Sequence, residues 1–332
     1  MYDRRGEYDP TSTYAASALV LGPTGAIGRA VSRELVVNGY RVYGLTRNAD
    51  AKARLPYAVV GVMGDIRSPE RWENVIERVD VVINCTAPAD LVSGMMDRAA
   101  AQREAEALAE ILDRLCTTMR HAKKRLVHTF GALLYEPDAQ GWIRENYAIS
   151  AGRGFGIRHR IAYPVLANHR KKGLKAISLC PAFVYGRGGW FEQGVLEPMA
   201  QGRSTFIGDG TQTMHYIAAS DVAAGYRLAI EHGLEGEDYL LADDQPVTLA
   251  AFTRLVAKEM GAPPPVGVPE EELAPLIGDW AVEAYTFCPK VDSAKAREQL
   301  GWTPRFKTVE EGVPVVVREY KRARIAQLTS AQ

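Results

Sequence analysis

Short apolar runs alternate with longer amphipathic segments through the first half of this chain. The runs that we predict to be strands are Ala18–Leu21, Arg41–Leu45, Ala58–Val62, Val81–Asn84, Leu126–Thr129 and Ala176–Leu179. Helical periodicity separates them, most clearly over Met95–His121 and from about Phe155 to Lys172. Strands that alternate with helices predict right-handed crossovers and a parallel sheet covered on both faces.

The first strand runs into three regularly spaced glycines, Gly22, Gly25 and Gly28, and Arg29–Val37 has the pattern of a helix. The first glycine permits a tight turn, the second lets a pyrophosphate approach the backbone, and the third lets the helix pack closely on the strand. The first amides of that helix then face the phosphates. This arrangement predicts a dinucleotide site on a doubly wound parallel α/β sheet of the Rossmann type, although glycines also mark ordinary turns.

The pattern changes after Tyr185, where Gly, Pro and short elements become frequent. We therefore divide the chain into a polar N-terminal extension (1–17), a nucleotide-binding domain (18–186) and a smaller, mostly C-terminal α/β substrate domain (187–332) interleaved with it. Pro164 lies inside the segment from Phe155 to Lys172, where its missing amide and its ring should kink or end the helix.

The end of the second strand indicates which dinucleotide binds. An acidic residue there would accept hydrogen bonds from the adenosine ribose, but this chain has Arg47, and Arg29 follows the third glycine. Guanidinium groups suit a 2′-phosphate, so NADP is favoured over NAD, the alternative being two solvated surface arginines.

Residues at other strand ends complete the predicted cofactor site. Asp65 suits the adenine amine, or else caps the next helix, and Cys85 and Ala87 supply small side chains. The full set assigned to the cofactor is Gly22, Thr24, Gly25, Ile27, Gly28, Arg29, Arg47, Asp65, Ile66, Cys85, Ala87, Pro181 and Phe183.

Composition narrows the function classes. The 332 residues carry 40 Lys plus Arg and 40 Asp plus Glu, a balance that argues against nucleic acid or an anionic membrane as partner. No apolar run is long enough to span a bilayer, and the first residues read as neither a signal nor a transit peptide, so we expect a cytoplasmic protein. The four cysteines and six histidines show no metal-site spacing, so no metal is expected.

Six motifs in order resemble those of the extended short-chain dehydrogenase/reductase family, which includes nucleotide-sugar epimerases and dehydratases. They are Gly22-Pro-Thr-Gly-Ala-Ile-Gly28, Gly64-Asp-Ile66, Pro181-Ala-Phe-Val-Tyr-Gly186, Gly208-Asp-Gly210, Asp221-Val-Ala223 and Lys295-Ala-Arg-Glu-Gln-Leu-Gly-Trp302. The resemblance covers the chain from Ala18 to about Tyr320 and implies NAD(P) chemistry. Members often pair through two long helices, which implies a homodimer in which Met95–His121 takes part.

The acid–base residues of that family are replaced here. The resemblance implies a Ser or Thr, a Tyr, and a Lys four residues after the Tyr, and the matching positions fall near Gly131 and on Phe155 and His159. Thr129 is the hydroxyl closest to the first of these positions. The candidates for catalysis are therefore His159, Phe155, Thr129 and Tyr147. The alternative for His159 is that it is an ordinary residue of the helix, on the surface or packed.

The diphosphate-binding arginines that the resemblance implies have no clear counterpart, which disfavours a nucleotide sugar as substrate. Aromatic side chains instead suggest a more apolar small molecule, although the same side chains could form core. The residues assigned to the substrate are Tyr185, Trp190, His215 and Tyr216.

Three functions remain open. The first is an atypical NADP(H)-dependent oxidoreductase that acts on a small carbonyl, imine or activated alkene without the usual Ser-Tyr-Lys set. The second is a non-redox isomerase, cyclase or lyase on the same fold. The third is an inactive protein that senses NADP(H).

Overall fold

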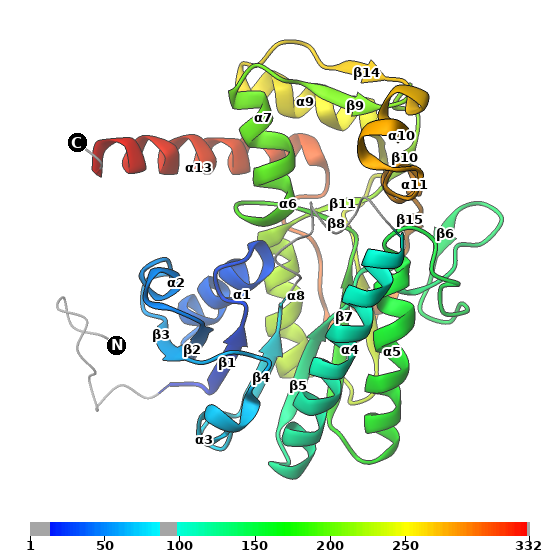
Figure 1. Ribbon diagram of the computed structural model, residues 1–332. Coiled ribbons are helices and arrows are strands. Elements are labelled where there is room, and N and C mark those ends of the chain that lie inside the picture. The colour runs from blue at the N-terminus through cyan, green and yellow to red at the C-terminus, as the bar shows by residue number, and fades with distance from the viewer. Residues whose placement is uncertain (1–13, 87–97, 331–332) are drawn as a thin grey trace.

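A seven-stranded sheet forms the centre of the molecule in the computed structural model, which describes residues 14–86 and 98–330 (Figure 1). Its strands are β1 (Ser17–Leu21), β2 (Arg41–Thr46), β3 (Val60–Met63), β4 (Val81–Asn84), β5 (Arg125–Thr129), β7 (Ala176–Pro181) and β12 (Asp238–Leu241). All neighbours pair in parallel, in the order β3-β2-β1-β4-β5-β7-β12. The order reverses between β1 and β4, so the predicted doubly wound sheet is confirmed, and such a switch point is where sheets of this kind commonly bind a ligand.

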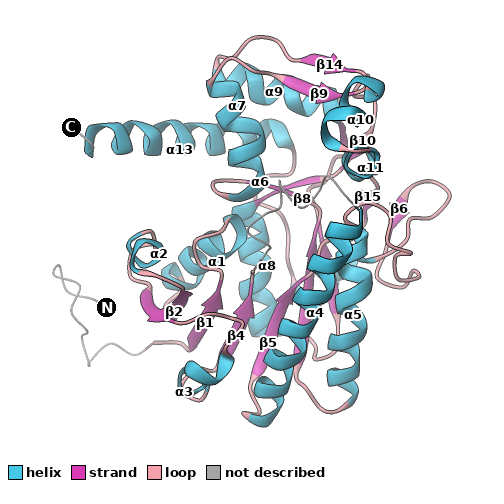
Figure 2. Ribbon diagram, viewed as in Figure 1, coloured by secondary structure: helices cyan, strands magenta, loops and turns pink. Residues whose placement is uncertain are grey.

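Two pairs of helices cover the sheet (Figure 2). α1 (Ala26–Val37) packs with α8 (Ala219–His232), while α4 (Arg98–His121) packs with α5 (Gly156–Lys171). α4 buries Leu112 and Leu115 against its own chain, and it also carries the partly buried Leu108 and Ile111. The predicted homodimer through this helix stays a prediction.

The predicted strands and helices occur with small shifts at their ends. β3 begins two residues late because Ala58 has a φ of 63°, which is not extended backbone. α1 begins three residues earlier than predicted, with Gly25 as its N-cap. Residues 95–97, the predicted beginning of the long helix, lie outside the described residues.

Pro164 does not end α5, so that part of the prediction was wrong. The helix continues from Gly156 to Lys171 with the proline inside it. Contacts with α4 hold α5 on both sides of the proline: Arg158 forms an ion pair with Glu104 at 2.8 Å, and His169 Nε2 forms a hydrogen bond with Asp113 at 2.9 Å. Because α4 supports both halves, the missing amide bond costs α5 a hydrogen bond but not its continuity.

A second lobe lies beyond the carboxyl ends of the strands. Its elements are β8 (Phe183–Tyr185), α6 (Gly189–Phe191), a π-helical turn η3 (Glu192–Leu196), α7 (Glu197–Ala200), β9 (Thr205–Ile207), β10 (Thr213–Met214), β11 (Tyr216–Ala218), β13 (Val247–Thr248), α9 (Leu249–Met260), β14 (Val266–Val268), α10 (Glu270–Ile277), α11 (Asp279–Thr286) and α13 (Val309–Ser330). A separate apolar cluster holds this lobe together, and Tyr216 stacks on Phe252 at its centre with 3.7 Å between ring centroids. α13 begins in this cluster and then extends outward (Figure 1).

Short elements complete the chain. They are α2 (Ala49–Ala53), η1 (Pro69–Arg71), α3 (Glu73–Ile76), η2 (Ala132–Leu134), β6 (Trp142–Ile143), β15 (Lys290–Val291) and α12 (Ala294–Leu300). None of the helices within residues 14–86 and 98–330 combines the length and the apolar character needed to cross a membrane.

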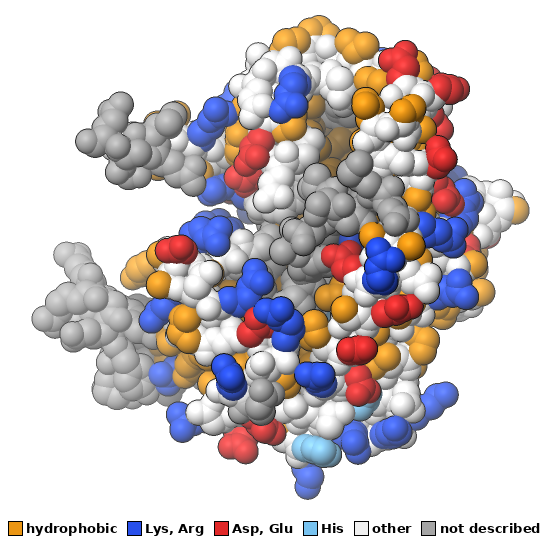
Figure 3. Space-filling view, viewed as in Figure 1, with side chains coloured by type: hydrophobic (Ala, Val, Ile, Leu, Met, Phe, Trp, Pro, Cys, Tyr) orange, Lys and Arg blue, Asp and Glu red, His pale blue; other side chains and the backbone are white. Residues whose placement is uncertain are grey.

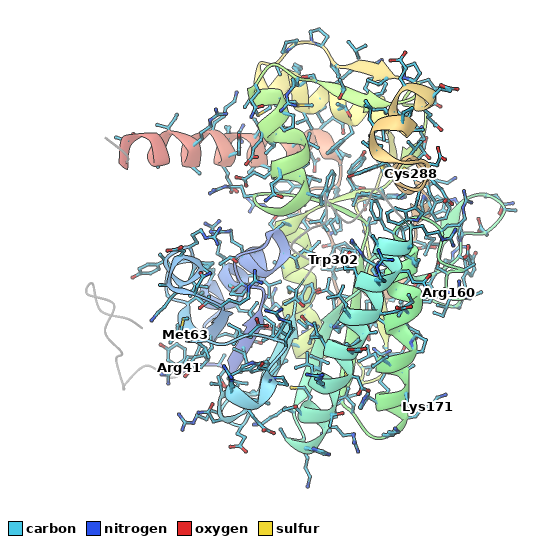
Figure 4. The ribbon with its side chains drawn as sticks, in the orientation of Figure 1. Arg41, Met63, Arg160, Lys171, Cys288 and Trp302 are labelled. Carbon is cyan, nitrogen blue, oxygen red and sulfur yellow. The ribbon has the colours of Figure 1, made fainter. Side chains whose placement is uncertain are left out.

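Buried polar groups mark the junction between the two lobes. Trp302 is fully buried and donates from Nε1 to the Asp221 carbonyl at 3.0 Å. Figure 4 shows Trp302 in the interior, and it shows Arg160 and Lys171 as exposed side chains that point outward from α5. Asp243 is 3% exposed, and neither of its carboxylate oxygens has a hydrogen-bond partner within the described residues. Burial first, and then repulsion by Asp244, raises the pKa of Asp243 to about 8.

Candidate active site

The glycine turn after β1 is tightly built. Gly22 has a φ of 78°, and a Cβ there would lie 3.0 Å from the Cys85 carbonyl oxygen. A Cβ on Gly28 would lie only 2.1 Å from the Gly22 carbonyl oxygen. Gly25 caps α1, and its carbonyl accepts from the Arg29 amide at 2.9 Å. The backbone therefore forms the cradle that a pyrophosphate needs at the start of α1, with Thr24 and Ile27 partly exposed beside it.

Arginines crowd the side of α1 that leads to the adenosine position. Arg29 donates from Nη2 to the Arg54 carbonyl at 3.1 Å. Burial, followed by the charges of Arg33 and Arg187, lowers the pKa of Arg29. Arg47 is exposed directly after β2. A concentration of like charge on one side of the nucleotide site suits a phosphate, which would relieve the repulsion.

Asp65 is engaged with its neighbour rather than free for adenine. Its Oδ2 lies 2.6 Å from Arg67 Nη2, and this hydrogen bond is the first cause of the lowered pKa of Asp65. Ile66 packs against the core, and Trp72 donates from Nε1 to the Asp65 carbonyl at 2.8 Å. An adenine amine would have to share Asp65 with Arg67.

The remaining predicted cofactor residues lie at strand ends. Cys85 follows β4, and burial raises the pKa of its thiol to about 12, so it is a neutral packing group. Pro181 ends β7, and Phe183 begins β8 with its ring edge-on to Trp190 at 6.1 Å between centroids. Ala87 lies outside the described residues.

The structure brings Gly131 and His159 into direct contact. Gly131 donates its amide hydrogen to His159 Nε2 at 3.1 Å, and a Cβ on Gly131 would lie 2.8 Å from that nitrogen. Phe155 stands at the beginning of α5, edge-on to Trp280 and Tyr285 with centroids 6.1 and 5.5 Å away. The glycine thus makes room for the imidazole.

His159 is a neutral imidazole at neutral pH. Burial, and then the charge of Arg158, lowers its pKa to about 3. Because Nε2 accepts from Gly131, the ring hydrogen is on Nδ1. His159 therefore cannot act as a cationic acid at neutral pH, but it can donate a hydrogen bond from Nδ1.

The hydroxyl of Thr129 is already committed. It donates to the Asn84 carbonyl at 2.7 Å and shares a short hydrogen bond with Tyr226. The Asn84 side chain in turn contacts His128 Nδ1 at 3.2 Å. The sequence analysis did not single out three members of this network, Asn84, His128 and Tyr226. For Asn84 a signal existed, because it is a polar residue at the end of the apolar run Val81–Asn84.

Tyr147 belongs to a polar network near β6. Its hydroxyl donates to Asp138 Oδ2 at 3.0 Å and accepts from Arg144, which also binds Asp292 at 2.8 Å. Its catalytic assignment is untested, and its hydroxyl is held by this network.

Three of the four predicted substrate residues lie in the interior. Tyr185 and Tyr216 are 0% and 1% exposed and belong to the second apolar cluster. His215 is buried and accepts at Nδ1 from the Val291 amide at 2.9 Å. Their burial fits the alternative that these side chains form core, whereas Trp190 is partly exposed. Within the described ranges no three His, Cys, Asp or Glu side chains gather as metal ligands.

The fold and the glycine cradle define a nucleotide-binding α/β protein, and comparison with known proteins supplies the family. The sequence profile of the NAD dependent epimerase/dehydratase family matches residues 18–242. The chain therefore belongs to this family, as its motifs predicted.

Individual relatives are distant. The chain is 25% identical over 298 residues to the uncharacterized protein YLL056C of Saccharomyces cerevisiae, covering 86% of this chain and 94% of that protein. It is 24% identical over 303 residues to a 3-diazoavenalumate denitrifying reductase of Streptomyces sp., covering 89% and 98%. A solved structure of the human epimerase family protein SDR39U1 with NADPH superposes with a TM-score of 0.73 at 17% identity, covering 91% of this chain and 99% of that one. The curated relatives thus include a reductase, and the human structure shares the fold.

Proposed function

We propose that this protein is an NADP(H)-dependent oxidoreductase that transfers hydride to a small, activated organic electrophile. The observation that carries the proposal is the Gly131–His159 contact beside Phe155. The family resemblance aligns this neutral, fixed imidazole and the Phe155 ring with the acid–base positions, and the glycine cradle remains well formed.

The residues present fit a bound dinucleotide with a 2′-phosphate. Gly22, Gly25 and Gly28 leave the backbone of the cradle open to the pyrophosphate. Arg29 and Arg47 provide cationic groups on the adenosine side. When bound, the reduced nicotinamide supplies a hydride.

The side chains of the site orient the substrate and do not supply its proton. Phe155, Trp280 and Tyr285 form an apolar wall, and His159 offers a neutral Nδ1–H donor. An iminium already carries the positive charge that hydride neutralises, and an activated alkene gives an enolate that water protonates. By its name, the Streptomyces relative reduces a diazo compound, and a diazo group is also an activated electrophile.

Nucleotide binding is the first test. We expect NADPH to bind more tightly than NADH in a fluorescence titration, and Arg47→Ala to weaken NADPH binding about tenfold or more while changing NADH binding little. Arg103→Ala, on the exposed side of α4, is the matched control and should leave both affinities unchanged. Equal affinities for the two nucleotides would contradict the NADP assignment.

Turnover is the second test, followed as loss of NADPH absorbance with an iminium, an enone and an unactivated ketone. We expect the first two classes to react and the ketone not to react. Binding of NADPH without reaction of any class would favour the nucleotide sensor instead.

A further inference from the structure

A second glycine-rich loop lies against the glycine cradle. Gly188 has a φ of 85°, and a Cβ there would lie 3.3 Å from the Ala26 amide nitrogen, at the start of α1. The next residue, Gly189, has a φ of 63° and would place its Cβ 3.4 Å from the Ala26 Cβ. The loop between β8 and α6 therefore reaches the same point at which the pyrophosphate would be held.

The residue before Gly188 in this loop is Arg187. Arg187 lies close enough to Arg29 for its charge to lower the pKa of Arg29. The Arg187 Nε atom is buried and has no hydrogen-bond partner among the described residues. Its counter-ion is Glu192, at 4.0 Å. A partly buried guanidinium with one distant carboxylate retains most of its hydrogen-bonding capacity for a ligand.

Glu192 also accepts a hydrogen bond from the Gly188 amide. The same carboxylate thus accepts from an amide of the loop and lies near its cation, a position that a phosphate oxygen could also take. The side chains of Arg187 and Glu192 line a partly open cleft that continues between α7 and α13, where Glu197 and Arg324 also face it. Figure 3 shows a hollow between the two lobes with Lys and Arg side chains along both of its edges.

We propose that Arg187 binds a phosphate group of the nucleotide, in competition with the Glu192 carboxylate. This inference rests on the proposed function, because the ligand is the same dinucleotide. It adds to the site a binding residue of the second lobe that the sequence analysis did not assign to the cofactor. The second lobe then closes on the nucleotide through an ion pair, and Glu192 sets how easily that pair forms.

The competition gives two substitutions with opposite effects. We expect Arg187→Gln to weaken NADPH binding about tenfold or more, because a charge-assisted contact is lost. We expect Glu192→Gln to strengthen NADPH binding by roughly threefold to tenfold, because the competing anion is removed. Two variants serve as controls: Glu197→Gln changes the charge of the same cleft by the same amount, and Arg203→Gln removes an exposed cation of the same lobe. Neither control should move either affinity by more than about twofold.

The titrations use the full chain with NADPH and NADH, and thermal unfolding shows that each variant is folded. If Arg187→Gln binds NADPH more weakly but NADH as before, Arg187 contacts the 2′-phosphate. If the variant loses affinity equally for NADPH and NADH, Arg187 contacts the pyrophosphate. Unchanged affinity for both in a folded Arg187→Gln overturns the inference. That result is distinct from failure of the proposed function, in which the unaltered chain itself would not bind NADPH.

Discussion

At the scale of single residues, His159 and Gly131 depend on each other. The imidazole occupies the space that a side chain on residue 131 would need. The correspondence of His159 to the family's lysine position is what the family resemblance implies, and it stays a prediction. Its protonation state could not be predicted from the sequence, because the low pKa comes from tertiary burial and from Arg158.

The low pKa of His159 predicts a flat pH profile. Since its pKa is about 3, the imidazole stays neutral from pH 5.5 to 8, and kcat/KM should show no ionisation near pH 6 to 7. Gly131→Ala should lower kcat by roughly tenfold or more with NADPH binding retained, because the new methyl group displaces the ring. Gly194→Ala, where a Cβ meets nothing within 4 Å, is the control. A titration near pH 6.5 that disappears in His159→Ala would show that His159 does act as an acid or base.

Asp243 predicts a pH-dependent stability. Its pKa is raised from 3.8 to about 8, so between those values the folded state binds more protons than the unfolded state, and stability falls as the pH rises. Asp243→Asn keeps the shape without the ionisation, and at pH 7 we expect its free energy of unfolding to exceed that of the unaltered chain by about 2–4 kcal/mol.

Urea unfolding at pH 5 and pH 8 provides the measurement for Asp243. The difference between the two proteins should grow with pH. A constant difference would show that Asp243 is already ionised in the folded state.

At the scale of elements, the features that local sequence patterns determine could be predicted, and those that depend on tertiary contacts could not. The strands and the glycine turn could be predicted because alternation and glycine spacing are local signals. The continuity of α5 through Pro164 could not, because the contacts with α4 on both sides of the proline are tertiary and leave no local signal in the sequence. The interior positions of Tyr185 and Tyr216 could not be predicted from the sequence either, because an aromatic residue gives the same local pattern in a core and in a binding pocket. Arg187 was missed because its glycine neighbours indicate only a turn.

The packing of α1 on the glycine turn predicts a strong effect at Gly28. In Gly28→Ala the added methyl group would lie 2.1 Å from a carbonyl oxygen, so the turn must open. We expect NADPH binding to be lost and the free energy of unfolding to fall by about 1–3 kcal/mol. Titration and urea unfolding of this variant beside Gly194→Ala check both effects. Normal NADPH affinity in Gly28→Ala would mean that the turn does not hold the nucleotide.

At the scale of the whole molecule, the two largest of the three apolar clusters among the described residues are joined by a polar junction. One cluster lies on both sides of the sheet and the other within the second lobe. The nucleotide cradle belongs to the first and the Arg187 loop to the second, so ligand binding at their contact would couple the lobes. Sequence patterns indicated the two regions but not this contact, which joins residues that are far apart in the chain.

The return of the chain to the sheet has a consequence for how such proteins diversify. β12 pairs with β7 only after the chain has built part of the second lobe between them. The chain then returns to that lobe from β13 to α11, comes back to α12, and ends in the second lobe with α13. The second lobe is therefore not a contiguous module that a single genetic crossover could exchange. New specificity in this architecture must arise by substitution and by insertion within loops, and a laboratory chimera would need several breakpoints placed together.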